Sequence, residues 1–193
     1  MLPEYFVYIG IAITASGGVK YLIETLKGEV QPNRVTWFLW SLSAFIAFFA
    51  QISQGVGIIA LLTFVVAFLP FLVFCASFLN KKAHWALTRF DLACGALSIV
   101  GLIAWGVTKE GNIAIFFSIL ADLLASFPTF VKSYTDPQSE SASAYSLNAV
   151  GDGLLLLTIK TWDFAHAGFA EYLFLNCLVL IFLIKSKIGV KKK

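Results

Sequence analysis

The chain has 193 residues, of which 59% are hydrophobic and only 13% are charged, and its mean hydropathy is +0.85. Soluble domains carry about 25% charged residues, so this composition excludes an ordinary soluble domain. Several nearly charge-free runs approach the roughly 20 residues that cross a bilayer. The run 58–74 is continuously apolar, which favours helices over the alternating strands of a membrane barrel. We therefore expect an all-α integral membrane protein, and no nucleic-acid partner.

Seven transmembrane helices are predicted in chain order. They cover residues 4–26, 35–52, 58–79, 85–107, 112–134, 144–159 and 164–184. The breaker cluster Gln31-Pro32-Asn33 separates the first two segments. A longer polar turn, residues 136–143, separates the fifth from the sixth.

The positive charges are distributed unevenly between the two sides of such a bundle. Twelve of the 14 Lys and Arg residues fall at one end, and only Lys109 and Lys160 fall at the other. Short loops rich in Lys and Arg stay in the cytoplasm. The pattern predicts a multi-pass protein of a plasma or inner membrane, with a cytoplasmic C-terminus and the N-terminus outside.

The chain also shows a faint internal repeat. Shifting the sequence by 108 residues overlays segments one to three on segments five to seven, with Trp37 on Tyr145. A second register pairs Lys20 with Lys132 and lengthens the first turn by four residues, and the sequence does not choose between them. We predict a three-helix repeat in 1–82, a linker helix in 83–111, and a second repeat with a basic tail in 112–193. Parallel repeats of this kind commonly build transporters, with the substrate site at the repeat interface.

Polar side chains inside the second repeat mark a candidate substrate site. Asp122 lies mid-segment in the fifth helix and Asn176 in the seventh, while Asn148 and Asp152 share one face of the sixth. An ionisable group at such a depth costs about 2.5–3.5 kcal/mol and usually faces the protein interior or a watery cavity. We expect these groups to hydrogen-bond a polar solute, with Asp122 or Asp152 able to take a proton. The alternative is that they only join helices.

Prolines and glycines suggest gating points. Pro70 and Pro128 each lie inside a predicted helix, where proline removes a backbone donor and kinks the chain. Gly151 and Gly153 flank Asp152 and permit either a hinge or a close helix approach. Static bends are the alternative for both prolines.

No catalytic or metal-binding pattern is present in the sequence. It has no Ser-His-Asp set, HExxH or Gly-rich phosphate loop, and its three cysteines form no CxxC pair. We expect no enzyme activity, no metal and no cofactor.

A family resemblance rests on the turn after the fifth segment. Phe127-Pro128, Lys132-Ser133-Tyr134, Ser139-Glu140 and Ser143 resemble the turn of the PQ-loop proteins. The three-one-three plan is similar to the SWEET sugar transporters. This resemblance implies a facilitated sugar carrier that works by alternating access, with sugar-binding asparagines in segments three and seven. Asn176 fits that expectation, whereas the 108-residue offset puts Phe68 at the other position.

Other functions remain open on the same plan. Trp37-Phe38-Leu39-Trp40 loosely resembles the tryptophan pair of bacterial vitamin transporters of the nicotinamide riboside type. That resemblance implies that Trp37 and Trp40 stack a ring, although an interfacial aromatic belt is the alternative. A proton-coupled amino-acid carrier and a non-transporting seven-helix receptor are further alternatives. The expected partners are a small-molecule substrate and the lipid bilayer, and a homo-oligomer is left open.

Overall fold

The computed structural model describes residues 2–80, 85–86, 88–94, 96, 99, 103 and 110–189. Within these residues all regular structure is helical. The long helices are α1 (Phe6–Lys27), α2 (Arg34–Ser53), α3 (Ala60–Ala76), α5 (Gly111–Thr135), α6 (Ala142–Thr158) and α7 (Phe169–Ser186). The all-α prediction is therefore confirmed for the part of the chain that the structure describes.

Among the residues that the structure describes, five helical segments are long and apolar enough to cross a membrane. They are Phe6–Lys27, Arg34–Ser53, Gly57–Ala76, Gly111–Thr135 and Phe164–Ser186, which indicates a multi-pass membrane protein. Helix α6 has only 17 residues, and 11 of the 23 residues in the predicted fourth segment, 85–107, lie outside the described residues. The count of seven spans therefore stays a prediction.

The helix ends follow from local capping. Helix α1 stops at Gly28, which adopts a φ of 76° that favours glycine, and its N–H is bonded to the carbonyls of the last turn. The Asn33 side chain accepts hydrogen bonds from the N–H groups of Val35 and Thr36 at the start of α2. Ser141 caps α6 in the same way, through the N–H of Ala144.

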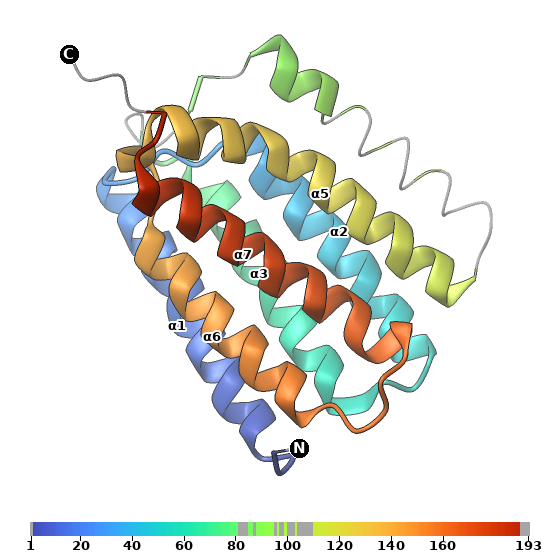
Figure 1. Ribbon diagram of the computed structural model, residues 1–193. Coiled ribbons are helices and arrows are strands. Elements are labelled where there is room, and N and C mark those ends of the chain that lie inside the picture. The colour runs from blue at the N-terminus through green and yellow to red at the C-terminus, as the bar shows by residue number, and fades with distance from the viewer. Residues whose placement is uncertain are drawn as a thin grey trace.

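The six long helices form a closed ring (Figure 1). In each group of three, the last helix packs between the other two: α3 lies between α1 and α2, and α7 lies between α5 and α6. The two groups then meet along α1 and α6 on one side of the ring and along α2 and α5 on the other. This order leaves an interior that every one of the six helices can line.

The helix bounds test the two registers of the repeat. Lys27 and Thr135, the last residues of α1 and α5, are 108 positions apart, as are the capping residues Asn33 and Ser141. The turns between them thus have equal lengths, in agreement with the ungapped register and not with the longer first turn.

The third helix pair differs: Phe68, at the offset position of Asn176, is 42% exposed, whereas its neighbours Leu69 and Pro70 line cavities. The 108-residue offset therefore does not give Phe68 surroundings equivalent to those of Asn176, and the repeat itself stays a prediction.

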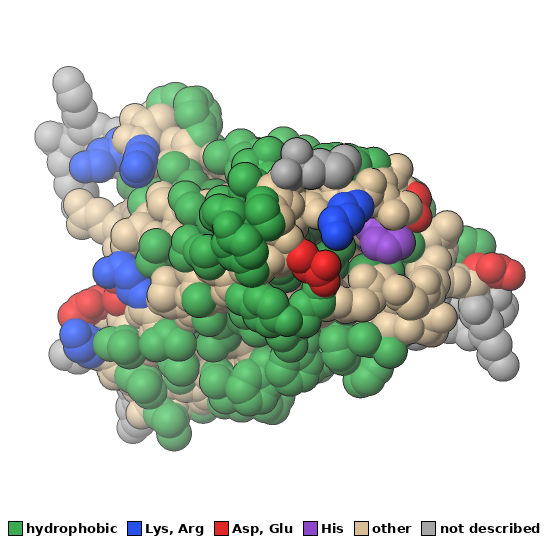
Figure 2. Space-filling view, turned by 90° about the horizontal axis from the view of Figure 1, so that it is seen from below, with side chains coloured by type: hydrophobic (Ala, Val, Ile, Leu, Met, Phe, Trp, Pro, Cys, Tyr) green, Lys and Arg blue, Asp and Glu red, His purple; other side chains and the backbone are tan. Residues whose placement is uncertain are grey.

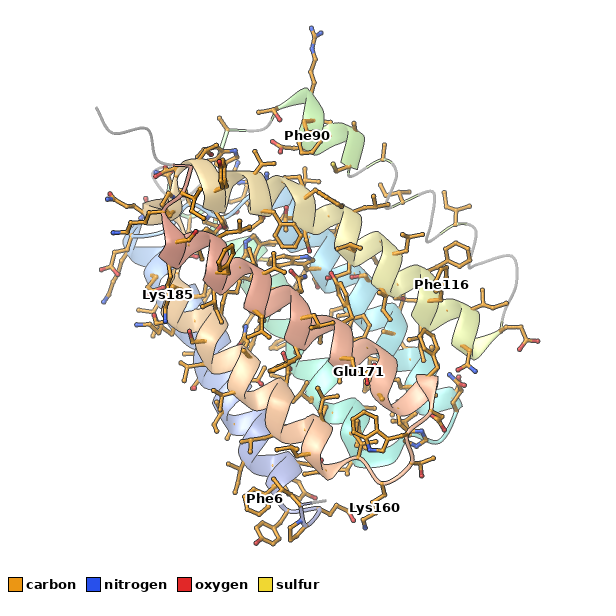
Figure 3. The ribbon with its side chains drawn as sticks, viewed as in Figure 1. Phe6, Phe90, Phe116, Lys160, Glu171 and Lys185 are labelled. Carbon is orange, nitrogen blue, oxygen red and sulfur yellow. The ribbon has the colours of Figure 1, made fainter. Side chains whose placement is uncertain are left out.

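The outer surface is suited to lipid. Hydrophobic side chains predominate over the middle of the face seen in Figure 2, and most of the Lys and Arg side chains in that view lie at its left end. Figure 3 places Lys185 at that end and Lys160 near the opposite end, beside the N-terminus. An apolar middle between charged ends is the pattern that a bilayer imposes.

Candidate functional site

A cavity lies inside the ring of helices. Its cavity volume, measured as the space open to the centre of a water molecule, is about 70 Å³, which is room for a few water molecules or a very small solute. The residues that line it are Trp37, Trp40, Val66, Pro70, Asp122, Tyr145, Asn148, Asp152, Leu173, Asn176, Cys177 and Leu180. All six residues predicted to bind substrate are in this set, although their role as ligands stays a prediction.

A second, smaller cavity adjoins the first. It is lined by Trp37, Val66, Pro70, Tyr145 and Asn148, which also line the first cavity, together with residues of α1 and α3. The ring interior therefore reaches from α7 across to α1. A solute held there would touch both groups of three helices.

One wall of the cavity is a hydrogen-bonded network that joins α2, α5 and α7. The Asp122 carboxylate accepts hydrogen bonds from Ser43 Oγ and from Tyr172 OH, the latter at 2.7 Å. Asn176 Nδ2 donates to Tyr172 OH at 2.8 Å and to Ser126 Oγ at 2.9 Å. These five residues fix the α5–α7 side of the site before any ligand arrives.

Ser126 determines the orientation of its neighbours. Its Oγ donates to the carbonyl of Asp122 and accepts from Trp40 Nε1 at 2.9 Å, as well as from Asn176. Because Ser126 and Tyr172 each use their single proton on Asp122, neither can donate to Asn176, which must present its amide nitrogen to them. Asn176 Oδ1 is left without a partner.

The α6 side of the cavity is polar but unsatisfied. Asp152 is buried, its Oδ1 has no hydrogen-bond partner, and no ion pair to it is found in the described part of the chain. Asn148 Oδ1 and Trp37 Nε1 also lack partners. Buried polar groups are normally hydrogen-bonded, so unsatisfied ones need an explanation such as a ligand or an unseen water.

The predicted gating residues have different surroundings. Pro70 lines the cavity, and Pro128 is buried within α5, which continues through it. Gly151 faces α1: a Cβ there would come within 2.7 Å of the Gly10 carbonyl oxygen and would also collide with Thr14. Gly153 faces Phe174 on α7 instead. Both glycines lie in an unbroken helix, so their observed role is close helix packing.

Two turns meet at one end of the ring around a buried ion pair. Lys132 Nζ lies 2.7 Å from Glu140 Oε1, with both side chains 0% exposed, and it also donates to the carbonyl of Gln31. Tyr21 OH and Tyr145 OH both donate to Glu140 Oε2, at 2.7 and 2.9 Å. We call these five residues the Lys132–Glu140 cluster. Because Tyr21 and Gln31 belong to the first half and the other three to the second, the cluster ties the halves together.

Sequence reasoning missed this cluster and part of the network. It treated Lys132 as a loop charge, whereas the side chain is buried and paired. Ser126 and Tyr172 gave no signal of their own, since hydroxyls are common in membrane helices, and Ser43 was expected only as a polar group inside the first repeat. Glu171 is exposed on α7 (Figure 3) and does not line the cavity.

Comparisons of the chain with family models, curated proteins and solved structures found no significant match. The resemblance to the SWEET and PQ-loop proteins therefore rests on the turn residues and the helix plan alone.

Proposed function

We propose that this protein carries a small polar solute across a membrane by alternating access, with the cavity as its binding site. The observation that carries the proposal is the cavity between two groups of three helices, in which buried polar atoms of Asp152, Asn148, Asn176 and Trp37 lack partners. A ligand that supplied those partners would be stabilised by groups already in place, because the network around Ser126 holds Asn176 in one orientation.

The arrangement of the halves supports alternating access. The same helix order occurs in both groups, and the groups meet through two equivalent pairs, α1 with α6 and α2 with α5. Such a ring can open at either end if the groups rock about an axis through it. The Lys132–Glu140 cluster closes the end where the turns meet and would have to separate for that end to open.

Sugars are the first solutes to test, following the resemblance to SWEET carriers. Purified protein in liposomes is expected to show saturable uptake of labelled glucose or another monosaccharide. Replacing Asn176 by Ala should abolish uptake, whereas Asn112→Ala, at an exposed asparagine on α5, should leave it unchanged. Absence of sugar flux in every condition would exclude the sugar version.

Proton coupling is a second candidate, favoured by Asp152. A buried carboxylate without a cationic partner is unstable as an anion and needs a proton or a cation. A vitamin, nucleoside or amino-acid carrier of this type would show uptake that rises with an imposed pH gradient. An uptake rate that does not change with the pH gradient would exclude proton coupling.

A further inference from the structure

The charges around the cavity are unbalanced. Asp122 and Asp152 both line it, and no Lys, Arg or His among the described residues does so. Lys132, which is linked to the cavity residue Tyr145 through Glu140, is already paired with Glu140 at 2.7 Å. The two carboxylates of the cavity therefore have no cationic partner within the described part of the chain.

The two carboxylates are not equivalent. Asp122 is held by hydroxyl donors from Ser43 and Tyr172, which stabilise it in place. Asp152 has no such donor within the described chain, and its Oδ1 is buried without a partner. Asp152 is thus the group whose charge a ligand would compensate.

The unpaired hydrogen-bonding atoms of the cavity also favour a ligand that donates hydrogen bonds. Asn176 Oδ1 is unpartnered, and the proton count at Ser126 and Tyr172 shows that it is an oxygen and not the amide nitrogen. Asp152 and Asn176 therefore both offer acceptors to a ligand. A protonated primary amine offers three donors and no acceptor.

Aromatic rings complete the environment. Trp37 and Trp40 both line the cavity, with ring centroids 5.2 Å apart in an edge-on arrangement. An indole face attracts a cation by its quadrupole, and the attraction grows when the cation is desolvated. Carboxylate, amide oxygen and indole together form a site for a positively charged group.

We propose that the solute is a protonated primary amine whose ammonium group binds Asp152 and Asn176 beside Trp37 and Trp40. This inference deepens the proposed function and rests on the same cavity. With a neutral solute, Asp152 would need a proton to become neutral, whereas an ammonium group compensates the carboxylate directly.

Matched ligand pairs test the inference by thermal unfolding of the purified full-length protein. Each pair exchanges an amine for a hydroxyl: tyramine with tyrosol, glucosamine with glucose, and ethanolamine with ethylene glycol. In at least one pair, we expect the amine alone to raise the unfolding midpoint saturably. Equal effects of both members in every pair, or no effect of any amine, would overturn the inference.

Substitutions test whether Asp152 is the residue that binds the amine. Losing one partner of a buried charge pair costs about 2 kcal/mol or more, so Asp152→Asn should weaken amine binding about 30-fold or more. Asp152→Glu, which keeps the charge, should retain the preference for the amine, and Glu171→Gln, at an exposed carboxylate outside the cavity, should bind like the unaltered protein. Amine binding that persists in Asp152→Asn would refute the role of that residue.

The outcome also separates this inference from the carrier proposal. Selective amine binding without flux in liposomes would remove the carrier function and keep the amine site. Flux of a neutral solute with no preference for its amine would keep the carrier function and remove the amine site.

Discussion

Ser126 shows how one hydroxyl can set the geometry of the whole α5–α7 wall. It accepts hydrogen bonds from both Trp40 Nε1 and Asn176 Nδ2 while donating to the Asp122 carbonyl. Without it, two buried N–H groups lose their acceptor. The side chain is short and has few rotamers, so it positions both partners at little cost in conformational entropy.

The variant Ser126→Ala should therefore be destabilised by about 1–3 kcal/mol, the penalty for unsatisfied buried donors. Ser146→Ala is a matched control, because Ser146 makes the same bond to the carbonyl four residues back, also at 2.8 Å, but no cross-helix bond. Its stability should change by only a few tenths of a kcal/mol. Thermal unfolding in detergent measures both, and equal shifts would show that Ser126 does not organise the site.

The site residues differ in how visible they are in the sequence. Asp122, Asp152 and Asn176 stand out because a charge or an amide in an apolar run is costly and needs a reason. Ser126 does not stand out, since a serine hydroxyl can bond a carbonyl of its own helix, and Tyr172 does not because tyrosines are common near the ends of membrane helices. Only the folded arrangement shows that their protons are spent on Asp122.

At the scale of elements, the contact between α1 and α6 depends on missing side chains. Gly151 and Gly10 lie so close that a Cβ on either would come within 3 Å of the carbonyl oxygen of the other. Gly17 likewise lies against α6, where a Cβ would come within 2.8 Å of the Ala144 carbonyl oxygen. Small residues let membrane helices approach closely and gain van der Waals contact.

Gly151→Ala should push α1 and α6 apart, because the obstructing atoms include backbone that cannot rotate away. We expect a loss of about 1–3 kcal/mol, typical of overpacking. Gly153→Ala tests the alternative that any side chain added to this part of α6 lowers the stability of the protein. Its Cβ would approach only the Phe174 ring, at 3.3 Å. That variant should lose less than about 1 kcal/mol, and a larger loss than in Gly151→Ala would contradict the packing account. Unfolding midpoints give the comparison.

Helix position could be predicted from sequence, but helix neighbours could not. Apolar runs located the long helices closely, for example 112–134 for α5 at Gly111–Thr135. Hydropathy does not distinguish which face of an apolar helix meets which partner, so the place of α3 between α1 and α2 was not foreseen. The outward position of Phe68 could not be predicted for the same reason, because hydropathy does not show which face of α3 points inward. A one-residue shift turns a helical side chain by about 100° and leaves the hydropathy profile unchanged.

At the scale of the whole molecule, the cavity is closed differently towards its two ends. The Lys132–Glu140 cluster, with its ion pair and hydrogen bonds, occupies the end where the turns meet. Towards the other end the ring is filled by buried apolar side chains, among them Ile115, Phe169 and Leu155. Apolar contacts are non-directional, whereas the cluster has fixed partners. If the protein works as the proposed carrier, the cluster is the discrete contact that has to break before this end opens.

Replacing one charged residue of the cluster should lower the stability of the protein more than replacing both charged residues together. Lys132→Met leaves Glu140 as an uncompensated buried anion, and Glu140→Gln leaves Lys132 as a cation, each at a cost of about 3–5 kcal/mol. The double variant Lys132→Met/Glu140→Gln keeps no stranded charge, so its loss should be smaller than either single loss. Thermal unfolding of the three variants checks this order. A double variant whose loss equals the sum of the single losses would mean that the pair is not coupled.

The double variant also tests whether the cluster closes the cavity. Cys177 lines the cavity, so its alkylation by a membrane-impermeant maleimide reports access to the site in a protein with Cys75 and Cys94 replaced by alanine. We expect faster labelling in the double variant, from the side of the membrane that carries the turns, because separation of the two halves no longer breaks an ion pair. The same pair of substitutions at Lys20 and Glu24, a partly exposed ion pair within α1 at 3.1 Å, should leave the rate unchanged. Unchanged labelling in the cluster variant would place the barrier elsewhere in the ring and remove the cluster from the transport cycle.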